Sequence, residues 1–390
     1  MKSGLYDGII CFGGEDWWYH NRGHFDLQMM REFSQNVPVL YINSLGMRIP
    51  RVNKDGAFLS RIFRKIRSML KNFVRINDSF GVLSLISIPG YNHIWIIKKI
   101  MLYSIKRAQK KMGIDCPVIW AALPSCITLL NNIPYKALIY QRTDRFETEE
   151  DVDYTYSKNL DLNMKKRADI TVFCTRHVYT AEKSACRDSV YIDHGVDFQK
   201  FAGAGDNNQY PDDLPKRNGK KIVGYVGGMD PITIDQELIK RVVENLPDYQ
   251  FIFVGHDNLP ENWCNHKNVF FAGKKPYEII QFYMAASDIL IMPWRQNKWI
   301  EACNPVKLKE YLATGRPIVS TYFPELDYYQ GLVTVASTAE DFTEAIKSSV
   351  NEVSMIEKRR KRVMGETWHM KYKIIERKIK SMEYQNRRLT

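Results

Sequence analysis

Short apolar runs alternate with segments of helical periodicity along most of this 390-residue chain. Strands that are buried on both faces of a parallel sheet read as such continuous apolar runs, and the segments between them then form the crossover helices. The alternation therefore predicts an α/β fold with a mainly parallel sheet. In the first half, the predicted strands are 7–13, 39–44, 81–88, 118–123, 137–143, 170–175 and 189–195, and the predicted helices are 22–34, 60–75, 92–112, 152–167 and 177–186.

The segment GAGDNNQYPDDLPKRNGK (203–220) interrupts the pattern, and its Gly, Pro, Asn and Asp content is typical of a linker. The alternation then resumes, which predicts two Rossmann-like domains facing a central cleft, 1–202 and 221–365. We expect the polar tail, 366–390, to be helical and to allow a crossing back to the first domain. The predicted strands of the second half are 221–227, 251–256, 268–273, 288–294, 317–321 and 333–337, and its predicted helices are 235–246, 276–287, 305–314 and 339–352.

The chain carries 56 Lys and Arg against 44 Asp and Glu, a formal net charge of +12. This excess favours a negatively charged partner, either nucleic acid, anionic lipid or a phosphorylated substrate. Nucleic acid is the least favoured, because no RRM, KH or zinc pattern is present. Seven dispersed cysteines indicate reduced thiols in the cytoplasm. No run approaches the roughly 18 apolar residues of a membrane span, so we expect a soluble or peripheral protein.

The stretch NPVKLKEYLATGRPIV (304–319) predicts a short, well-delimited helix. Asn304 can cap it with Pro305 in its first turn, and Gly315 can end it. Lys307 falls in the first turn, where free backbone N–H groups suit a phosphate, and Glu310 lies on the same face one turn on. A sugar nucleotide needs a cation for its phosphates and a carboxylate for its ribose. An ordinary exposed ion pair has the same spacing.

A second candidate region follows the first predicted strand, in CFGGEDWWYHNRGHFD (11–26). Gly14 lies in the strand-to-helix turn, and His24 and Asp26 begin the next helix. Trp17 and Trp18 either stack on a sugar or lipid carrier or pack beneath the loop. We place these residues on the acceptor side of the cleft, with His24 as one candidate general base because of its near-neutral pKa.

Asp144 is the other candidate general base, because it follows the apolar run 137–143 at the end where cleft residues belong. It can instead cap the next helix or pair with Arg142 or Arg145. The triplet DVD (151–153) is interpreted as a helix start rather than a metal site.

A basic amphipathic helix is predicted over 60–75, with no acidic residue and apolar residues at helical spacing. Such a helix either lies on an anionic membrane or buries its apolar face on the sheet. The segment 92–112 adds six more Lys and Arg residues.

NPVKLKEYLATGRPIVST resembles the "NPxKxxEYLAxGxPVV" signature of GT-B glycosyltransferases that build bacterial surface polysaccharides, including teichuronic-acid-type enzymes and relatives of family four. GYVGGMD (224–230), VYIDHGVDFQKF (190–201) and the run 268–294 are also similar to that family. The resemblance implies that Lys307 holds the donor diphosphate and Glu310 the ribose, with backbone at Gly227 and Gly228 close to the phosphates.

The usual Arg and Lys of this family are missing after the glycine turn, in GGMDPITID. Arg295 or Lys298 would then substitute, Glu301 would contact the donor sugar, and Asn304 would open the binding helix. The resemblance implies a hexosyltransferase-type enzyme that moves a sugar from a nucleotide-sugar to a lipid-linked or growing surface glycan, without cofactor or metal. It would associate peripherally with the inner face of the cell membrane. The alternatives are a nucleotide-sugar epimerase of the same fold and a non-catalytic nucleotide-sugar-binding protein.

Overall fold

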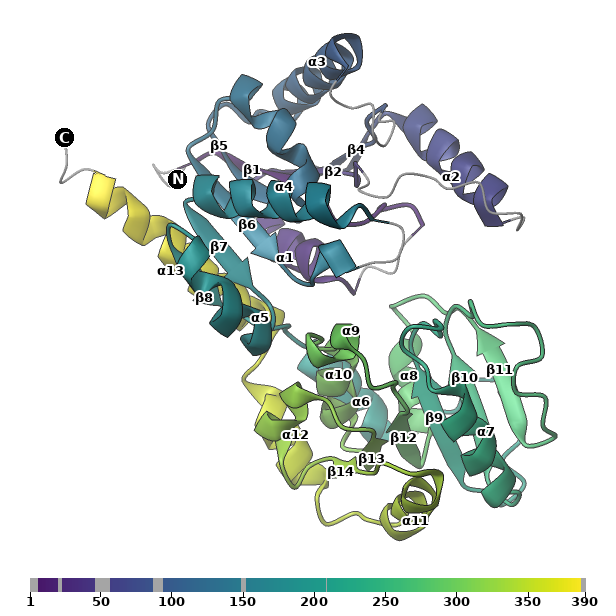
Figure 1. Ribbon diagram of the computed structural model, residues 1–390. Helices are drawn as coiled ribbons and strands as arrows, with labels where there is room; N and C mark the ends of the chain where they lie inside the picture. Colours follow the sequence, from purple (N-terminus) through teal and green to yellow (C-terminus); the bar gives the residue numbers. More distant parts are fainter. Residues whose placement is uncertain are drawn as a thin grey trace. The chain divides into compact units, whose positions relative to one another are not determined.

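The computed structural model describes residues 6–19, 23–45, 57–86, 94–148, 152–207 and 209–386. The chain forms two compact units (Figure 1). Unit 1 is Met1–Asp193 together with Lys371–Thr390, and unit 2 is His194–Met370.

Unit 1 is built on an eight-stranded sheet in the order β3-β4-β2-β1-β5-β6-β7-β8, in which only β3 is antiparallel to its neighbour. Helices α3 and α4 bury apolar residues on one face of this sheet, and α1 packs with Trp120 on the other. The strands are β1 (Gly8–Phe12), β2 (Val39–Ile42), β3 (Phe73–Asn77), β4 (Phe80–Leu83), β5 (Pro117–Ala121), β6 (Ala137–Arg142), β7 (Ile170–Phe173) and β8 (Ser189–Tyr191). The helices are α1 (Phe25–Ser34), α2 (Ala57–Lys71), α3 (Trp95–Met112), α4 (Tyr154–Arg167) and α5 (Arg176–Glu182).

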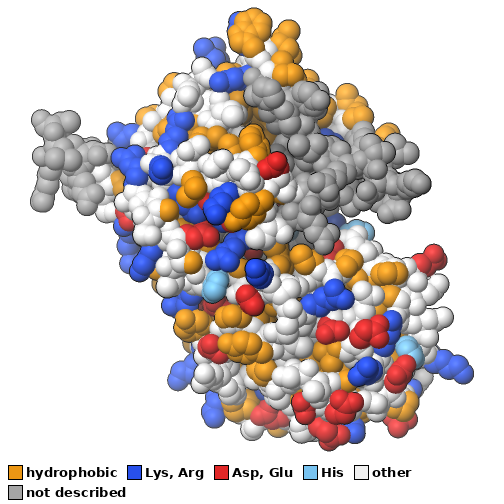
Figure 2. Space-filling view, in the orientation of Figure 1, with side chains coloured by type: hydrophobic (Ala, Val, Ile, Leu, Met, Phe, Trp, Pro, Cys, Tyr) orange, Lys and Arg blue, Asp and Glu red, His pale blue; other side chains and the backbone are white. Residues whose placement is uncertain are grey.

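Unit 2 holds a six-stranded parallel sheet in the order β11-β10-β9-β12-β13-β14. On the face seen in Figure 2, its Lys and Arg side chains are interspersed with Asp and Glu. The strands are β9 (Ile222–Val226), β10 (Gln250–Val254), β11 (Val269–Gly273), β12 (Ile289–Met292), β13 (Ile318–Ser320) and β14 (Thr334–Val335). The helices are α6 (Phe198–Asn207), α7 (Gln236–Asn245), α8 (Ile280–Ala286), α9 (Lys298–Glu301), α10 (Val306–Thr314), α11 (Ala339–Ser349) and α12 (Ile356–Met364).

The boundary between the units differs from the expected one. It lies between Asp193 and His194, and the start of the expected linker belongs to α6. The reason is the buried side chain of Phe201, which anchors α6 in the core of unit 2. The helix is glycine-rich at its end, and this composition made it look like a linker.

The C-terminal helix α13 (Trp368–Asn386) begins in unit 2, and from Lys371 on it belongs to unit 1. Tyr372 packs edge-on against Phe33 of α1, with ring centroids 5.0 Å apart, and accepts a hydrogen bond from Asn36 at 3.1 Å. The predicted crossing of the tail to the first domain is thereby confirmed.

The expected helix over 60–75 is wrong at its C-terminal end. Helix α2 ends at Lys71, Asn72 adopts a left-handed conformation (φ 47°), and the following residues form β3. The aromatic and β-branched residues of 73–76 suit an edge strand, but apolar spacing alone does not separate strand from helix over such a short run. Of the other predicted elements, residues 22, 87, 88, 92 and 93 lie outside the described residues.

Candidate active site

The sheet of unit 2 reverses its strand order beside β9, whose neighbours are β10 on one side and β12 on the other. Loops that leave two such neighbouring strands diverge, and the gap at their carboxyl ends is where open α/β sheets bind ligands. Gly227 and Gly228 directly follow β9, and Trp294 and Arg295 follow β12. The fold therefore places the glycine turn beside the expected binding position.

Gly227 lies where the backbone and a lysine approach each other closely. A Cβ atom at this position would lie 2.0 Å from Nζ of Lys307, and a Cβ at Gly255 would lie 1.8 Å from the carbonyl oxygen of Gly227. Only glycine leaves room for these approaches. The turn is thus shaped to bring backbone, and not a side chain, next to Lys307.

Helix α10 carries the two predicted donor residues, but its start differs from the expectation. Pro305 occupies the cap position, one residue later than the position expected for Asn304, and this cap residue makes no side-chain hydrogen bond to the helix. Asn304 is instead buried just before the helix. Gly315 ends the helix in a left-handed conformation, as expected (φ 80°).

The side chain of Lys307 reaches the glycine turn between the aromatic rings of Tyr225 and Trp294. Its Nζ donates a hydrogen bond of 2.9 Å to the hydroxyl of Tyr225, and Nζ lies 4.6 Å from the centroid of that ring and 5.4 Å from that of Trp294. The Tyr225 hydroxyl in turn donates to the carbonyl oxygen of Gly228 at 2.7 Å. One chain of bonds thus joins the ammonium group to the turn after β9.

Glu310 is only 3% exposed. Burial raises the pKa of its carboxyl to about 7, although the charge of Lys200, a hydrogen bond with Tyr277 and the charge of Lys307 oppose this rise, and Asp197 adds to it. The carboxyl therefore changes its protonation state near neutral pH.

One oxygen of the same carboxyl, Oε1 of Glu310, has no hydrogen-bond partner in the structure. A buried acceptor without a partner costs about 1 to 3 kcal/mol. Each buried atom without a partner needs a specific explanation, and binding of an absent group is one. A hydroxyl group of a ligand would supply the missing donor.

The second cation near Glu310 is Lys200 of α6, which the sequence reasoning missed. Its Nζ lies 3.7 Å from the ring centroid of Tyr277 and hydrogen-bonds the carbonyl oxygen of that residue. The expected substitutes for the missing clamp, Arg295 and Lys298, are exposed, and so is Glu301. The cations that act most strongly on Glu310 are therefore Lys200 and Lys307.

Tyr225, Tyr277 and Trp294 were also missed. Trp294 is buried, yet its indole N–H has no hydrogen-bond partner. The only signal for these residues in the sequence was their position inside the stretches 224–230 and 268–294, which resemble the family.

In unit 1, the predicted acceptor-side residues gather at the carboxyl end of β1. Oδ2 of Asp26, which is 2% exposed, accepts 2.9 Å hydrogen bonds from the backbone N–H of Gly14 and from the hydroxyl of Tyr41. Asp26 thus holds the turn after β1 in place.

The two tryptophans of this loop differ from each other. Trp17 is buried and packs 4.8 Å from the ring centroid of Phe80, so it supports the loop from beneath. Trp18 is half-buried, donates from Nε1 to Oγ of Ser84 at 3.2 Å, and has Nζ of Lys71 3.7 Å above its ring.

Asp144 and His24 lie on the same edge of the sheet. Burial raises the pKa of the Cys174 thiol well above its ordinary value, and the carboxylates of Asp144, Asp193 and Asp26 contribute to the rise. Asp144 therefore lies close to the end of β7. His24 is the exposed cap residue of α1.

Asp153, the last residue of the DVD triplet, caps α4 by accepting from the backbone N–H of Tyr156 at 2.8 Å. The interpretation of this triplet as a helix start is confirmed at this residue. Within the described residues, no group of three His, Cys, Asp or Glu could hold a metal ion.

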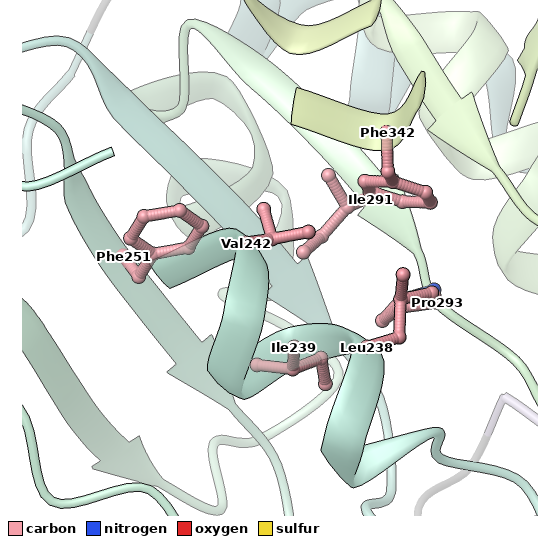
Figure 3. A pocket seen from close by; sticks show the side chains of 7 residues that line it. All are labelled: Leu238, Ile239, Val242, Phe251, Ile291, Pro293 and Phe342. Carbon is pink, nitrogen blue, oxygen red and sulfur yellow. The ribbon is translucent and has the colours of Figure 1, made fainter. Parts of the chain in front are cut away.

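A small pocket of unit 2 lies away from these residues, between α7 and the sheet (Figure 3). Its lining is apolar: Leu238, Ile239, Val242, Phe251, Ile291, Pro293 and Phe342. Without a polar side chain it has nothing to orient a charged ligand, and we interpret it as part of the core.

Known proteins similar to this chain agree with this architecture. The Anabaena protein HepE in complex with UDP and glucose superposes with a TM-score of 0.64 at 14% identity, over 96% of this chain and 100% of HepE. A glycosyltransferase of Rickettsia africae superposes with a TM-score of 0.63 at 13% identity, over 97% and 98% of the two chains. These likenesses establish the fold, which is the GT-B fold of two Rossmann-like domains.

Sequence comparison narrows the class further. Residues 220–352, which lie in unit 2, match the family model described as Glycosyl transferases group 1. TuaH of Bacillus subtilis (strain 168), which carries the name of a teichuronic acid biosynthesis glycosyltransferase, is 31% identical over 185 residues. That match spans 44% of this chain and 45% of TuaH.

Proposed function

We propose that the protein is a glycosyltransferase whose unit 2 binds a nucleotide-sugar donor. The observation that carries this proposal is the cluster at the strand-order reversal, where Lys307, Glu310 and the Gly227–Gly228 turn come together within a group 1 glycosyl transferase domain. Each part matches a different part of the donor. HepE, of the same fold, was crystallised with UDP and glucose.

Lys307 and the free N–H groups at the start of α10 bind the diphosphate. They stabilise the negative charge that develops on it as the sugar leaves, which is a main source of catalysis in such reactions. Oε1 of Glu310 accepts a hydrogen bond from a ribose hydroxyl group. This oxygen has no hydrogen-bond partner in the structure, which holds no ligand. Lys200 stands near as a second cation, and no resident cofactor or metal is included in this proposal.

Unit 1 presents the acceptor, which we propose to be a lipid-linked or growing glycan at the inner face of the cell membrane. The similarity to TuaH supports an envelope polysaccharide. Asp144 acts as general base on the acceptor hydroxyl, and His24 is the alternative base on the same edge of the sheet. Among the described residues, no helix is both long and apolar enough to cross a bilayer.

The donor site is tested by thermal unfolding with UDP, GDP and TDP, because a ligand that binds only the folded protein raises its stability. One of them is expected to raise the melting temperature of the wild type, and Lys307→Ala is expected to abolish that rise. Lys358→Ala, which removes an exposed cation of α12 in the same unit, is the matched control and should leave it unchanged. If none of the three nucleotides stabilises the wild type, the proposed donor site is wrong.

Catalysis is tested by radiolabelled transfer to a lipid extract. Asp144→Asn is expected to lower kcat by about 10²- to 10⁴-fold with unchanged nucleotide binding, whereas His24→Gln is expected to have a small effect. The reverse result would assign the base to His24. Nucleotide binding without transfer to any acceptor would favour the non-catalytic alternative, and transfer that survives EDTA would support the absence of a metal.

A further inference from the structure

Two helices of unit 1 concentrate nearly all of the positive charge excess. Helices α2 and α3 contain 15 and 18 residues, and neither contains an acidic residue. The chain as a whole has a net charge of +12, so the rest of it is close to neutral. The eleven cations of the two helices are Arg61, Arg64, Lys65, Arg67 and Lys71 in α2, and Lys98, Lys99, Lys106, Arg107, Lys110 and Lys111 in α3.

The same helices also expose large apolar side chains. In α2, Phe63 is 65%, Ile66 47% and Leu70 80% exposed. Their spacing of three and four residues places them on one face, which Arg67 and Lys71 border. An apolar helix face normally lies against a protein core, whereas this one is open to solvent.

Helix α3 also exposes both apolar side chains and cations, and the two kinds of residue predominate in different parts of the helix. Its buried face, with Met101 and Ile105, packs on the sheet. Its opposite face exposes apolar side chains in the first turns and cations in the last turns. The exposed residues are Trp95, Ile96, Lys99, Ile100, Tyr103, Lys106, Arg107, Lys110 and Lys111.

Helix α2 leads directly into the edge strand β3, and α3 packs across the neighbouring strands β4 and β2 (Figure 1). Nζ of Lys111 lies 5.2 Å from the ring centroid of Phe73 in β3, so the end of α3 lies beside the strand that follows α2. Both helices therefore adjoin the same end of the sheet of unit 1.

We propose that α2 and α3 dock unit 1 on an anionic lipid bilayer. Lysine and arginine near such a surface contribute about 1 kcal/mol each, and exposed Phe, Leu, Ile and Trp side chains insert at the boundary between headgroups and acyl chains. The exposed cations of the two helices lie among large apolar side chains, with no acid in either helix, and this combination matches both layers of that surface. These cations are Arg64, Arg67 and Lys71 in α2, and Lys99, Lys106, Arg107, Lys110 and Lys111 in α3. Lys65 is not among them, because its Nζ donates a hydrogen bond of 2.7 Å to the carbonyl oxygen of Ser44. The inference deepens the proposed function, because it names the surface that would bring the enzyme to a lipid-linked acceptor.

Charge argues against the other occupants. A second copy of this surface would bring two sets of cations together without a carboxylate in either helix. Nucleic acid would satisfy the cations but would leave the apolar side chains of α2 in contact with water. An anionic bilayer satisfies both.

The test is flotation of the full chain with vesicles of phosphatidylcholine alone or with 30% phosphatidylglycerol. Binding to the anionic vesicles only, and weaker binding at high salt, is expected. Phe63→Ser with Leu70→Ser should lower binding about tenfold or more, and Lys106→Gln with Arg107→Gln should lower it about fivefold per cation. The matched controls lie in unit 2: Val353→Ser with Met364→Ser, both exposed apolar residues, and Lys358→Gln with Lys361→Gln.

Equal loss in the control variants, or binding to neutral vesicles with the same affinity, would overturn the proposal. Tighter binding to a DNA duplex than to anionic vesicles would assign the surface to nucleic acid and would also overturn it. Nucleotide-induced thermal stabilisation is measured on the same variants. Membrane binding that fails while this stabilisation persists rejects the docking surface alone, whereas the opposite outcome rejects the donor site alone.

Discussion

The two units differ sharply in charge. Unit 1 has 35 Lys and Arg against 21 Asp and Glu, a net charge of +14, and unit 2 has 21 against 23, a net charge of −2. Both are doubly wound α/β sheets of similar design, so the fold does not require this difference. The difference fits the two binding roles that we propose. Unit 2 would bind a small anion through a few specifically placed cations, and unit 1 would bind an extended anionic surface.

The buried charges show a second contrast. In unit 1, Arg142 has no exposed side-chain surface and pairs with Glu147 at 2.8 Å, Glu182 at 3.2 Å and Asp161 at 3.4 Å. In unit 2, Glu310 is similarly buried and its Oε1 has no hydrogen-bond partner. Nη1 of Arg142 also has no partner, but the charge of Arg142 is balanced by three carboxylates of the protein. The ion pairs of Arg142 stabilise unit 1, whereas we assign the unpaired oxygen of Glu310 to a ligand.

The largest effect is expected from removing the guanidinium group of Arg142. Arg142→Met leaves three carboxylates without their shared partner, which should destabilise unit 1 by about 3 to 5 kcal/mol. Arg187→Met, which breaks the exposed pair with Asp169, should cost about 1 kcal/mol or less. Urea unfolding measures both, and a similar effect of the two substitutions would show that the network of Arg142 is not structural.

Most strands of the fold and two residues of the candidate donor site could be predicted from the sequence, whereas the other residues of that site could not. The strands were predictable because buried parallel strands are continuous apolar runs, and Lys307 and Glu310 because they share one short helix. Lys200 lies in α6, Tyr225 in β9 and Tyr277 in the segment between β11 and α8. No local pattern shows that these three segments meet, since only the tertiary fold brings them together.

The same limit explains the errors. Residues 73–77 carry apolar side chains that fit either a helix or a strand, and pairing with β4 decides in favour of the strand. Asp26 was placed on the acceptor side, and the structure adds a supporting role that the sequence did not show, because its carboxylate bonds Gly14 and Tyr41. An aspartate at the start of a helix looks the same in the sequence whether it binds an acceptor or supports a neighbouring turn.

The two strand-end glycines should respond very differently to an added methyl group. Gly227→Ala places a Cβ 2.0 Å from Nζ of Lys307, whereas the nearest atoms to a Cβ at Gly14 lie 3.8 Å away. Gly227→Ala should therefore cost about 1 to 3 kcal/mol and displace Lys307, with weaker nucleotide binding. Gly14→Ala should be close to neutral. Calorimetric titration with the nucleotide and urea unfolding check both, and normal nucleotide binding by Gly227→Ala would show that Lys307 is not confined by the turn.

The units should also respond to pH in opposite directions. Glu310 has its pKa raised from 4.5 to about 7, so its folded form holds the proton more tightly than the unfolded chain. Stability therefore falls as pH rises through this window, by about 2 kcal/mol between pH 5.5 and 8. Urea unfolding of the wild type should show this fall, and Glu310→Gln should remove it.

Glu182 of unit 1 has the opposite shift. Burial would raise its pKa, but the charges of Arg142 and Lys165 outweigh burial and lower it. Its stabilisation is present above the ordinary pKa and is lost only as the pH falls below that value, so it stays constant between pH 5.5 and 8. A fall in stability that persists in Glu310→Gln over this range would assign the titration to another group.

The smallest effects compare one tryptophan from each unit. Trp18→Phe removes an indole N–H that bonds Ser84, so it should cost unit 1 about 1 kcal/mol. Trp294→Phe removes an N–H that has no partner, so unit 2 should lose little stability without ligand. If that N–H is instead satisfied by the bound donor, Trp294→Phe should weaken nucleotide-sugar binding severalfold, measured by calorimetric titration. A loss of unfolding stability equal to that of Trp18→Phe, with unchanged donor affinity, would make Trp294 a packing residue only. The assignment of an unpaired buried atom of unit 2 to the donor would then rest on Glu310.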